Sequence, residues 1–400
     1  MSNYNCVMIP EMLFFQEGPG VRNSQYKTEG IKLLNVANLQ NGEIDLSTSE
    51  RYISKEEAYG RYNHFMVDEG DLIIASSGIK VDYFDKKMGF VRKEHLPLCM
   101  NTSTIRFKTL DKNKMDLNFF MYYLKTEYFK AQLAKLITGS AQLNFGPSHL
   151  KQISVPVPPI EEQKKIAEIL DKASNLISLR KKQIEKLDLL VKARFIEMFG
   201  NPVLNSKGWE IKDINSVSEL IVDCPHSTPK YSSENTGYMC IRTTILKPNY
   251  INWNEVDYIS EAEYNARTKR YVPKQGDIVY SREGAILGIA SIIDRKGHIA
   301  LGQRIMLISV SDLMINPRFL CFLMNSEGVL EQVKNLIGGS ASPHINVSDV
   351  KRMTIIYPPI DLQNQFADFV QQVEKQKEQL QQGLEKLELT YKALMQQYFN

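Results

Sequence analysis

Apolar residues recur at coiled-coil spacing in two long segments of the chain, the first ending near residue 200 and the second near residue 400. A proline pair stands at the entrance of each segment, and Gly200 follows the first, as is typical of the start and end of a helix. The spacing predicts two helices of about 39 residues, each about 58 Å long. The apolar positions are Ile184, Leu187, Val191 and Met198 in the first segment and Leu380, Leu384, Leu387, Tyr391, Leu394 and Tyr398 in the second.

Two arginines interrupt the first apolar stripe, Arg180 and Arg194, where the second stripe has Leu380 and Leu394. An arginine at the edge of a helix–helix seam can lay its stem along the partner helix and keep its charge in water. A helix of this length exceeds what a compact domain needs internally, so we expect each to pack on something outside its own domain. An ordinary pair of amphipathic core helices is the alternative.

The rest of the chain is rich in short apolar or alternating runs bounded by glycine and aspartate, which are typical of β-strands. A short amphipathic helix follows the last such run in each half, and its apolar face is expected in the core. These patterns predict globular parts that mix strands with helices. The runs are GDLIIAS from Gly70, TSTIRFKT from Thr102, GDIVYS from Gly276 and RIMLISV from Arg304.

The chain contains a tandem duplication. ITGSAQLNFGPSHLKQISVPVPPIEEQ, from Ile137, lies over IGGSASPHINVSDVKRMTIIYPPIDLQ, from Ile337, at an offset of 200 residues without a gap. Further upstream, YISKEEAY from Tyr52 matches YISEAEY from Tyr258 in a shifted register. We therefore predict an α+β fold with two similar mixed α/β domains, each followed by a long helix.

Two equivalent long helices in a duplicated chain are most simply related by an internal two-fold axis. Such an axis packs the helices as an antiparallel coiled coil with pseudo-two-fold symmetry and puts the globular domains at its opposite ends. The predicted boundaries are 1–156 for the first globular domain, 157–200 for the first helix, 201–356 for the second domain and 357–400 for the second helix.

Composition restricts the class of protein. With 400 residues, 43% of them hydrophobic and 24% charged, the chain has the make-up of a globular protein with two or three domains. The longest apolar run, from Gly284 to the residue before Asp294, is shorter than the roughly 20 residues that a bilayer requires. No export signal stands at the N-terminus, so we expect a cytoplasmic protein. Five widely spaced cysteines favour neither a disulfide framework nor a zinc site.

Motifs that identify catalytic sites in a single sequence are absent. The chain has no phosphate loop, no dinucleotide-binding glycine motif, no nucleophile elbow and no H-E-x-x-H. The six histidines are dispersed without ligand spacing, so we predict neither catalytic residues nor metal ligands. The net charge of +3 implies that any footprint for nucleic acid is a local patch.

The loops of both halves carry side chains suited to nucleic acid. Glycine beside a strand end lets the backbone approach a phosphate or base, Arg and Lys can read guanine, and Asn and Gln can read adenine. For any single residue, an ordinary solvated loop is the alternative. The candidate DNA-binding residues are Ser76, Ser77, Lys80, Lys86, Lys87, Gln142 and Asn144 in the first half, and His226, Ser227, Lys230, Tyr231, Arg242, Arg267, Lys269, Arg270, Ser281, Arg282, His344 and Asn346 in the second.

Three features of the sequence point to a known family: PPIEEQKKIAEILDKA, from Pro158, ARFIEMFGNPVLNSKGWE, from Ala193, and the diverged second copy. On these features, and over essentially its whole length, the chain resembles the specificity subunit of type I restriction-modification systems. It implies two target recognition domains, each of which reads one half of a bipartite site in double-stranded DNA. It also implies that the helices set the gap between the half-sites.

The same resemblance implies the partners and the location of the chemistry. Two methyltransferase (modification) subunits would dock on the helices, restriction/translocase subunits would join them, and no membrane is involved. The specificity subunit would have no catalytic residue and no cofactor of its own. S-adenosylmethionine, ATP and Mg would be bound by the partner subunits.

The sequence departs from the family pattern at its start. NSKGWEIKDINSVSEL, from Asn205, introduces the second domain, whereas the first has no matching Gly-Trp, so its lead-in is expected to be shortened or supplied elsewhere. Because the loops of the two halves differ, we predict two different half-sites and an asymmetric target. A two-headed scaffold for protein partners and a self-sufficient nuclease or methyltransferase are the alternatives.

Overall fold

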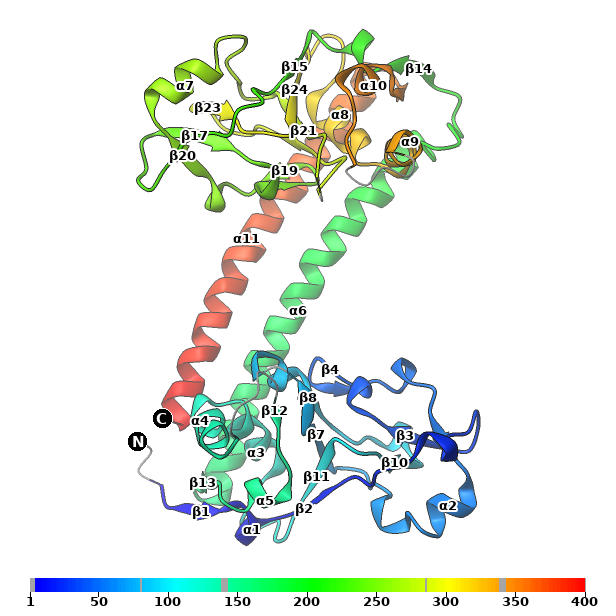
Figure 1. Cartoon of the computed structure of the whole chain (residues 1–400), viewed down its shortest axis with the longest axis vertical. Coiled ribbons are helices and arrows are strands. Elements are labelled where there is room, and N and C mark those ends of the chain that lie inside the picture. Colours follow the sequence, from blue (N-terminus) through cyan, green and yellow to red (C-terminus); the bar gives the residue numbers. More distant parts are fainter. Residues whose placement is uncertain (1–3, 80, 138–142, 285, 338–342, 400) are drawn as a thin grey trace. The chain divides into compact units, whose positions relative to one another are not determined.

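The computed structural model divides the chain into two compact units. The first comprises Met1–Lys181 with Gln382–Asn400, and the second comprises Lys182–Gln381. Two helices of 40 residues, α6 (Ile160–Phe199) and α11 (Ile360–Phe399), therefore each contribute to both units (Figure 1). The residues that the structure describes are 4–79, 81–137, 143–284, 286–337 and 343–399.

The globular part of the first unit, here called module 1, contains a central antiparallel sheet and a smaller distal sheet. The central sheet has the strand order β2-β11-β7-β9, and the distal sheet has the order β10-β3-β6 with a parallel pair, β10 and β3. Figure 1 shows α3 and α4 beside α6 within this unit. The bounds are β2 Leu13–Glu17, β3 Ile31–Leu34, β6 Tyr52–Ile53, β7 Leu72–Ala75, β9 Met88–Phe90, β10 Leu98–Met100, β11 Thr104–Thr109, α2 Lys55–Tyr59, α3 Leu117–Leu124 and α4 Glu127–Leu136.

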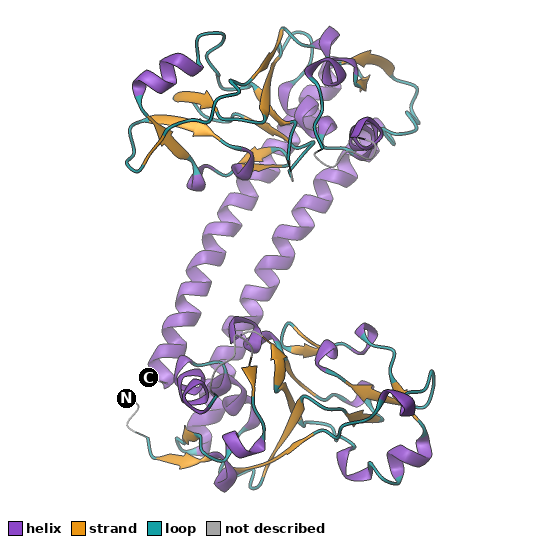
Figure 2. Ribbon diagram, viewed as in Figure 1, coloured by secondary structure: helices purple, strands orange, loops and turns teal. Residues whose placement is uncertain are grey.

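The globular part of the second unit, module 2, repeats this topology, which confirms the predicted duplication. Its central sheet has the order β15-β24-β21-β22, and its distal sheet, β16-β20-β17-β23, again contains a parallel pair, β17 and β23. Figure 2 shows the mixture of helices and strands in both modules. The bounds are β15 Leu220–Asp223, β16 Tyr231–Ser232, β17 Tyr238–Ile241, β20 Asp257–Ile259, β21 Ile278–Ser281, β22 Ala290–Ile292, β23 His298–Leu301, β24 Ile305–Ser309, α7 Glu261–Arg267, α8 Pro317–Met324 and α9 Glu327–Ile337.

The lead-in strand of module 1 is present in this chain. Strand β1 (Cys6–Met8) pairs antiparallel with β13 (Ser154–Pro156), just as β14 (Glu210–Asp213) pairs with β25 (Thr354–Tyr357) in module 2. The expectation that module 1 lacks this lead-in is therefore corrected for the strand. The Gly-Trp step is not needed to form it, because β1 obtains its register from the ladder with β13.

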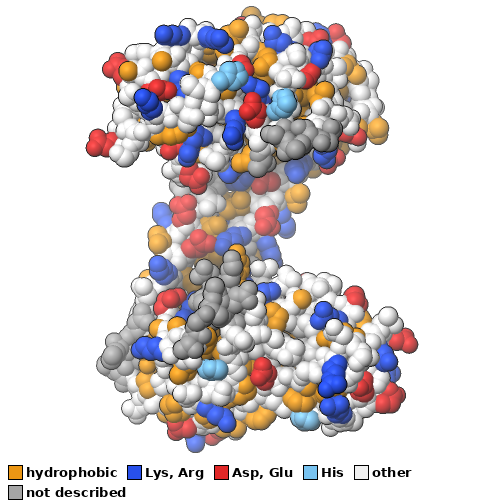
Figure 3. Space-filling view, in the orientation of Figure 1, with side chains coloured by type: hydrophobic (Ala, Val, Ile, Leu, Met, Phe, Trp, Pro, Cys, Tyr) orange, Lys and Arg blue, Asp and Glu red, His pale blue; other side chains and the backbone are white. Residues whose placement is uncertain are grey.

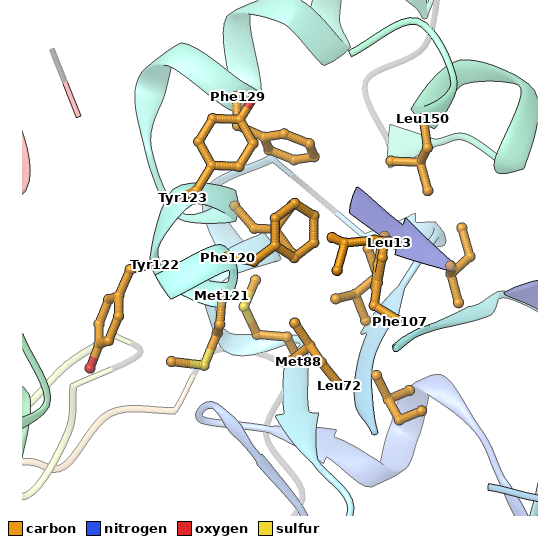
Figure 4. Packing of buried hydrophobic residues seen from close by; sticks show 14 of the residues in the cluster. Leu13, Leu72, Met88, Phe107, Phe120, Met121, Tyr122, Tyr123, Phe129 and Leu150 are labelled. Atoms are coloured by element: carbon orange, nitrogen blue, oxygen red, sulfur yellow. The ribbon is translucent and has the colours of Figure 1, made fainter. Parts of the chain in front are cut away.

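In the first unit, the two long helices run antiparallel and pack on module 1. Lys181 of α6 forms an ion pair of 2.7 Å with Glu388 of α11, and the ring of Phe399 lies 5.1 Å from that of Phe119 on α3. Figure 4 shows Tyr122 of α3 pointing away from Tyr123 and Phe129. Its hydroxyl donates to Asp171 of α6 at 2.5 Å, so α3 is fixed to the long helix by both apolar and polar contacts.

In the second unit, the same antiparallel pairing is built around aromatic rings. Phe366 of α11 is fully buried and its ring lies 5.5 Å from Phe195 and 5.6 Å from Phe199, both on α6. Lys377 of α11 is 2.6 Å from Asp188 of α6. Because the contact residues fall along one helix as they rise along the other, the helices run in opposite directions here too.

The two arginines of the apolar stripe lie against the neighbouring helix, as predicted. The guanidinium of Arg194 lies 5.9 Å from the centre of the Phe369 ring. That of Arg180 reaches Gly383, where an added Cβ would be 3.4 Å from its Nη1. The glycine in α11 therefore leaves room for the arginine of α6, which explains a residue that otherwise lowers helix stability.

The repeated Pro-Pro-Ile-x-x-Gln element joins each long helix to its module through one buried glutamine. Gln163 accepts a hydrogen bond from the backbone of Asp116 at 2.9 Å and donates to the carbonyls of Lys114 and Pro158, both at 2.8 Å. Gln363 accepts from Asn316 and donates to Pro358 in the same way. Both side chains are fully buried, so this glutamine fixes the helix start to the loop before α3 or α8.

We expect Gln163→Glu to lower the free energy of unfolding by about 2–4 kcal/mol, because it removes two buried donors and places a carboxylate against carbonyl oxygens. Chemical denaturation of the full chain, followed by circular dichroism, measures this change. Gln183→Glu, at an exposed position of α6, is the matched control. Equal stability of the two variants would contradict this role of Gln163.

Candidate nucleic-acid interface

Three segments meet at one edge of each module through matching backbone hydrogen bonds. In module 1, the amide of Ser76 donates to Ser103 at 2.8 Å, and the amide of Phe145 donates to Ser76 at 2.9 Å. In module 2, Arg282 donates to Arg304 at 3.0 Å and Ile345 donates to Arg282 at 2.9 Å. The residues after β7 and β21 are thus joined to the turn after β10 or β23 and to the segment before α5 (Pro147–Leu150) or α10 (Val347–Arg352).

The repeated Gly-Asp step before these strands is structural. Asp71 and Asp277 are buried, and each accepts a hydrogen bond from the backbone three residues earlier, at 2.9 Å from Asp68 and 2.8 Å from Lys274. Burial raises the pKa of both carboxyls, although these hydrogen bonds oppose the rise. Gly70 and Gly276 supply the positive φ of the turn. The motif therefore builds the strand entrance, and the candidate contacts lie at the strand's other end.

In module 2, an acidic residue binds Arg282, the candidate residue that directly follows β21. Both oxygens of Asp223 accept from the guanidinium of Arg282, at 2.9 and 3.0 Å, and Glu283 lies 3.1 Å from the same arginine. In module 1, Glu17 and Ser76 stand at the corresponding positions, and burial raises the pKa of Glu17. The two modules thus share this arrangement but differ in charge at the matching position.

A second support in module 2 fixes the loop that follows β15. The guanidinium of Arg267 is buried and donates to the carbonyls of Leu301 at 3.0 Å and Ser227 at 2.5 Å. On this loop His226 is 78% exposed and lies 3.5 Å from Asp223, and Lys230 is exposed as well. The structure therefore brings His226 and Ser227 together with the edge formed around Arg282, whereas no contact among the described residues links Lys230 to it.

The remaining candidates of module 2 lie at varying distances from this edge. Arg242 follows β17, forms an ion pair with Asp257, and lies 5.2 Å from the ring of Tyr231. An added Cβ on Gly302 would lie 3.7 Å from the Cα of Arg242, which places this arginine next to the turn after β23. Lys269 and Arg270 are exposed after α7, and no contact among the described residues links them to the edge.

The segment before α10 completes the edge. His344 forms an isolated β-bridge with Glu283, the residue after Arg282. Asn346 is the cap residue of α10, and its side chain donates to Asp349 at 3.1 Å. Both are therefore held close to Arg282 by the backbone hydrogen bond from Ile345.

The candidates of module 1 form a smaller and more neutral group. The hydroxyl of Ser77 donates to that of Ser103 at 2.6 Å, and Asn144 pairs with Ser77 across the β12–β8 ladder. Lys86 lies 5.6 Å from the ring of Tyr83, and Lys87 donates to the carbonyl of Val36 at 3.5 Å. Lys80 and Gln142 lie outside the described residues. Strand β8 is Ser77–Ile79 and β12 is Leu143–Asn144.

Four candidates are too buried to touch DNA through their side chains. Ser76 and Ser281 are fully buried, and Arg267 and Arg282 use their guanidinium groups within the domain. Ser281 still belongs to β21, where alternate side chains point into the core. These residues support the edge, and we leave them out of the proposed contact surface.

Sequence reasoning missed several residues that share the edge. In module 1, Asn101 donates to Asn35 at 2.8 Å, and Arg51 lies 5.1 Å from the ring of Tyr26. These four side chains and Ser103 belong to the lining of a cleft of about 580 Å³. In module 2, Arg304 occupies the place of Ser103. The matching backbone register could not be read from sequences that differ so much between the halves.

Surface charge is mixed on both units. Figure 3 shows Lys and Arg side chains interspersed with Asp and Glu on the visible face of each unit. Among the described residues, no group of three or more His, Cys, Asp or Glu side chains is placed to hold a metal ion. No helix in the described part of the chain is long and apolar enough to span a membrane.

Comparison with known proteins decides the family. A family model for the type I restriction modification DNA specificity domain matches residues 21–189 and again residues 206–389. The chain belongs to this specificity family. Each half of the duplication thus corresponds to one specificity domain, and each matched range includes most of a module and most of its long helix.

Proteins named as type I restriction enzyme specificity subunits match most of this chain. The MjaVIII specificity subunit of Methanocaldococcus jannaschii is 26% identical over 348 residues, which cover 80% of this chain and 78% of the relative. The EcoKI specificity subunit of Escherichia coli is 22% identical over 370 residues, covering 87% of this chain and 76% of the relative. The resemblance seen in the sequence is therefore confirmed, and the chain is a specificity subunit of the type I restriction-modification class.

Solved structures of the specificity family share the fold. The type I restriction-modification S subunit from M. genitalium aligns with a TM-score of 0.59 at 15% identity, covering 100% of this chain and 97% of that one. A chain from a structure on complex assembly and conformational transition of a type I system aligns with a TM-score of 0.54, also at 15% identity, covering 100% and 98%. Specificity domains thus keep this architecture while their sequences diverge.

Proposed function

We propose that each module of this specificity subunit reads one half of an asymmetric, bipartite site in double-stranded DNA. The observation that carries the proposal is the matched edge of the two modules, where one backbone arrangement presents different side chains. Module 1 offers Ser77 and Asn144, whereas module 2 offers Glu283 and His344 at the matching positions. Phosphate contacts would position each module, and base contacts at this edge would specify the sequence.

The antiparallel helices suit two further roles in this proposal. They would set the gap between the half-sites, and they would dock two methyltransferase subunits, which restriction/translocase subunits would join. The catalytic residues, S-adenosylmethionine, ATP and Mg would then belong to those partners, and the subunit would supply recognition alone.

A methylation map tests the proposal. The chain is produced with its methyltransferase subunits in a host that lacks them, and methylated bases are located across the genome. We expect one bipartite motif whose two halves differ. In vitro, binding of the complex to that motif is expected to depend on sequence and to weaken steeply with salt, because counterions are released from the phosphates. Methylation without any motif, or binding that ignores DNA sequence, would favour a protein-binding scaffold instead.

Docking of the methyltransferase subunits is testable on α6. Leu176 and Leu179 are 52% and 57% exposed, and the equivalent positions of α11 are Gln376 and Gln379. We expect Leu176→Gln with Leu179→Gln to weaken binding of one methyltransferase copy by about 10-fold or more, because an apolar docking face becomes polar. Analytical ultracentrifugation of the co-purified complex measures the loss.

The matched control for this variant is Tyr59→Gln. Tyr59 is also a largely exposed apolar residue, at 54%, and it lies on α2, away from the long helices. We expect this control to retain both methyltransferase copies. A full complement of two copies in the leucine variant would contradict docking on this face.

A further inference from the structure

The turn after β23 holds Arg304 in a left-handed backbone conformation. Its φ is 64°, and Ser103, at the matching place after β10, has a φ of 65°. Residues with a Cβ rarely adopt this conformation, and they keep it where the surroundings fix it, often at functional sites. Here the surroundings are alike, because the carbonyls of Ser103 and Arg304 accept the matching hydrogen bonds from Ser76 and Arg282. Both modules therefore retain one side chain at one strained position of the edge.

The side chain of Arg304 is exposed, and no ion pair or hydrogen bond to another described residue holds its guanidinium. Its Nη1 would lie 3.7 Å from a Cβ added to Gly284, so it rests against the loop that follows β21. An exposed arginine without such partners keeps its five N–H donors available for a ligand.

The other arginines of this edge are committed to the protein. Arg282 is bound by Asp223 through two hydrogen bonds, Arg267 donates to two carbonyls, and Arg242 forms an ion pair with Asp257. The carboxylate and the carbonyls therefore use the directional donors of Arg282 and Arg267, whereas Arg242 meets Asp257 through its Nε. Of these four arginines, Arg304 is the one whose guanidinium has no ion pair or hydrogen bond to a described residue, and it stands on a backbone that the bond from Arg282 fixes.

We propose that Arg304 reads a guanine in the half-site of module 2, by donating to O6 and N7 of the base in the major groove. The inference rests on the proposed function and names one of its base contacts. A guanidinium matches these two acceptors in one plane, which a point charge or a hydroxyl does not. Ser103 cannot make this contact in module 1, so the two modules discriminate different bases from the same place in the fold.

The test replaces Arg304 with the residue that module 1 uses. The full chain with Arg304→Ser is produced with its methyltransferase subunits, and the methylated motif is mapped across the host genome. We expect one G·C position in one half-site to become degenerate, with the preference for guanine falling roughly 5- to 150-fold. The other half-site and the gap stay unchanged. Arg352→Ser, at an exposed arginine of α10 that pairs only with Asp349 among the described residues, is expected to keep the motif intact.

A second measurement covers the case in which the variant complex no longer methylates DNA. The purified complex is mixed with a duplex library that is randomised at each position of the motif in turn, and the bound fraction is sequenced at several salt concentrations. Loss of preference at one guanine supports the inference. Uniform weakening at all positions, with a salt slope reduced by about one, identifies a phosphate contact and overturns it.

The outcomes separate this inference from the function on which it rests. If the unmodified chain yields a bipartite motif and Arg304→Ser leaves every position of it intact, Arg304 is not a base reader, although the specificity role stands. If the unmodified chain yields no motif at all, the specificity role itself fails, and the base contact fails with it.

Discussion

Lengthening both long helices by seven residues is expected to move the two half-sites apart by about three base pairs and to leave their sequences unchanged. Seven residues add about 10.5 Å of helix, and stacked base pairs rise about 3.4 Å each. Seven residues also return the helix seam to within about 20° of its original phase, so the antiparallel pairing is retained. The insertions belong after Lys181 and after Gln381, where the compact units divide each helix.

The measurement is a methylation map of the lengthened chain, produced with its methyltransferase subunits. Sites with the original gap are expected to lose methylation almost completely, because one half-site then falls out of register with its module. An insertion in α6 alone is the matched control. It shifts Asp188 and Phe195 away from Lys377 and Phe366, so we expect it to abolish the complex. A lengthened pair that still methylates the old gap would contradict the ruler function of the helices.

Sequence alone was sufficient for the long helices and the duplication, and there are physical reasons for this. Apolar residues that recur at helical spacing, with no proline among them, predict a single amphipathic helix. The proline pair fixes where each helix begins. The offset of 200 residues links the two copies without any knowledge of their fold. The same regularity predicted that Arg180 and Arg194 lie along the neighbouring helix, which their contacts with Gly383 and Phe369 confirm.

The burial of the glutamine in the repeated element cannot be predicted from the sequence. Gln163 looks like a solvated residue in the first turn of a charged helix. Its burial depends on the carbonyl of Pro158 and on that of Lys114, which lies 49 residues earlier in the chain. Such a partner set is a tertiary property, which local periodicity does not contain.

Candidate DNA contacts were the least predictable part, because chemistry alone does not say which way a side chain points. Arg267 stands in the basic run NARTKR, yet the helical spacing of α7 places it on the side of Tyr264, inside the module. In the sequence, Arg304 stands only at the start of a predicted strand. Its role at the edge depends on a left-handed backbone and on hydrogen bonds with a distant segment, and neither leaves a local signature in the sequence.

Placing module 2 in both positions is expected to convert the target into two inverted copies of one half-site with the original gap. Residues 4–156 are replaced by residues 208–356, because β1 and β13 occupy the places of β14 and β25. Inversion is expected under the proposed function, because antiparallel helices would hold two identical modules in opposite orientations along the DNA. A methylation map of the altered chain is expected to show no trace of the first half-site.

Whether the exchanged chain folds depends on how module 2 packs on the long helices in the first unit. Phe319 of α8 contacts Phe199 and Phe366 in the second unit, at 4.9 and 6.4 Å between ring centres. In the first unit the residue equivalent to Phe366 is Ile166, whose smaller side chain would leave a cavity; the cost is expected to be below the roughly 3–5 kcal/mol of a phenylalanine-to-alanine truncation in a core. The exchanged chain therefore also carries Ile166→Phe, and the exchange without it is the matched control, which we expect to be less stable. A map that retained two unlike half-sites would show that specificity lies outside the modules.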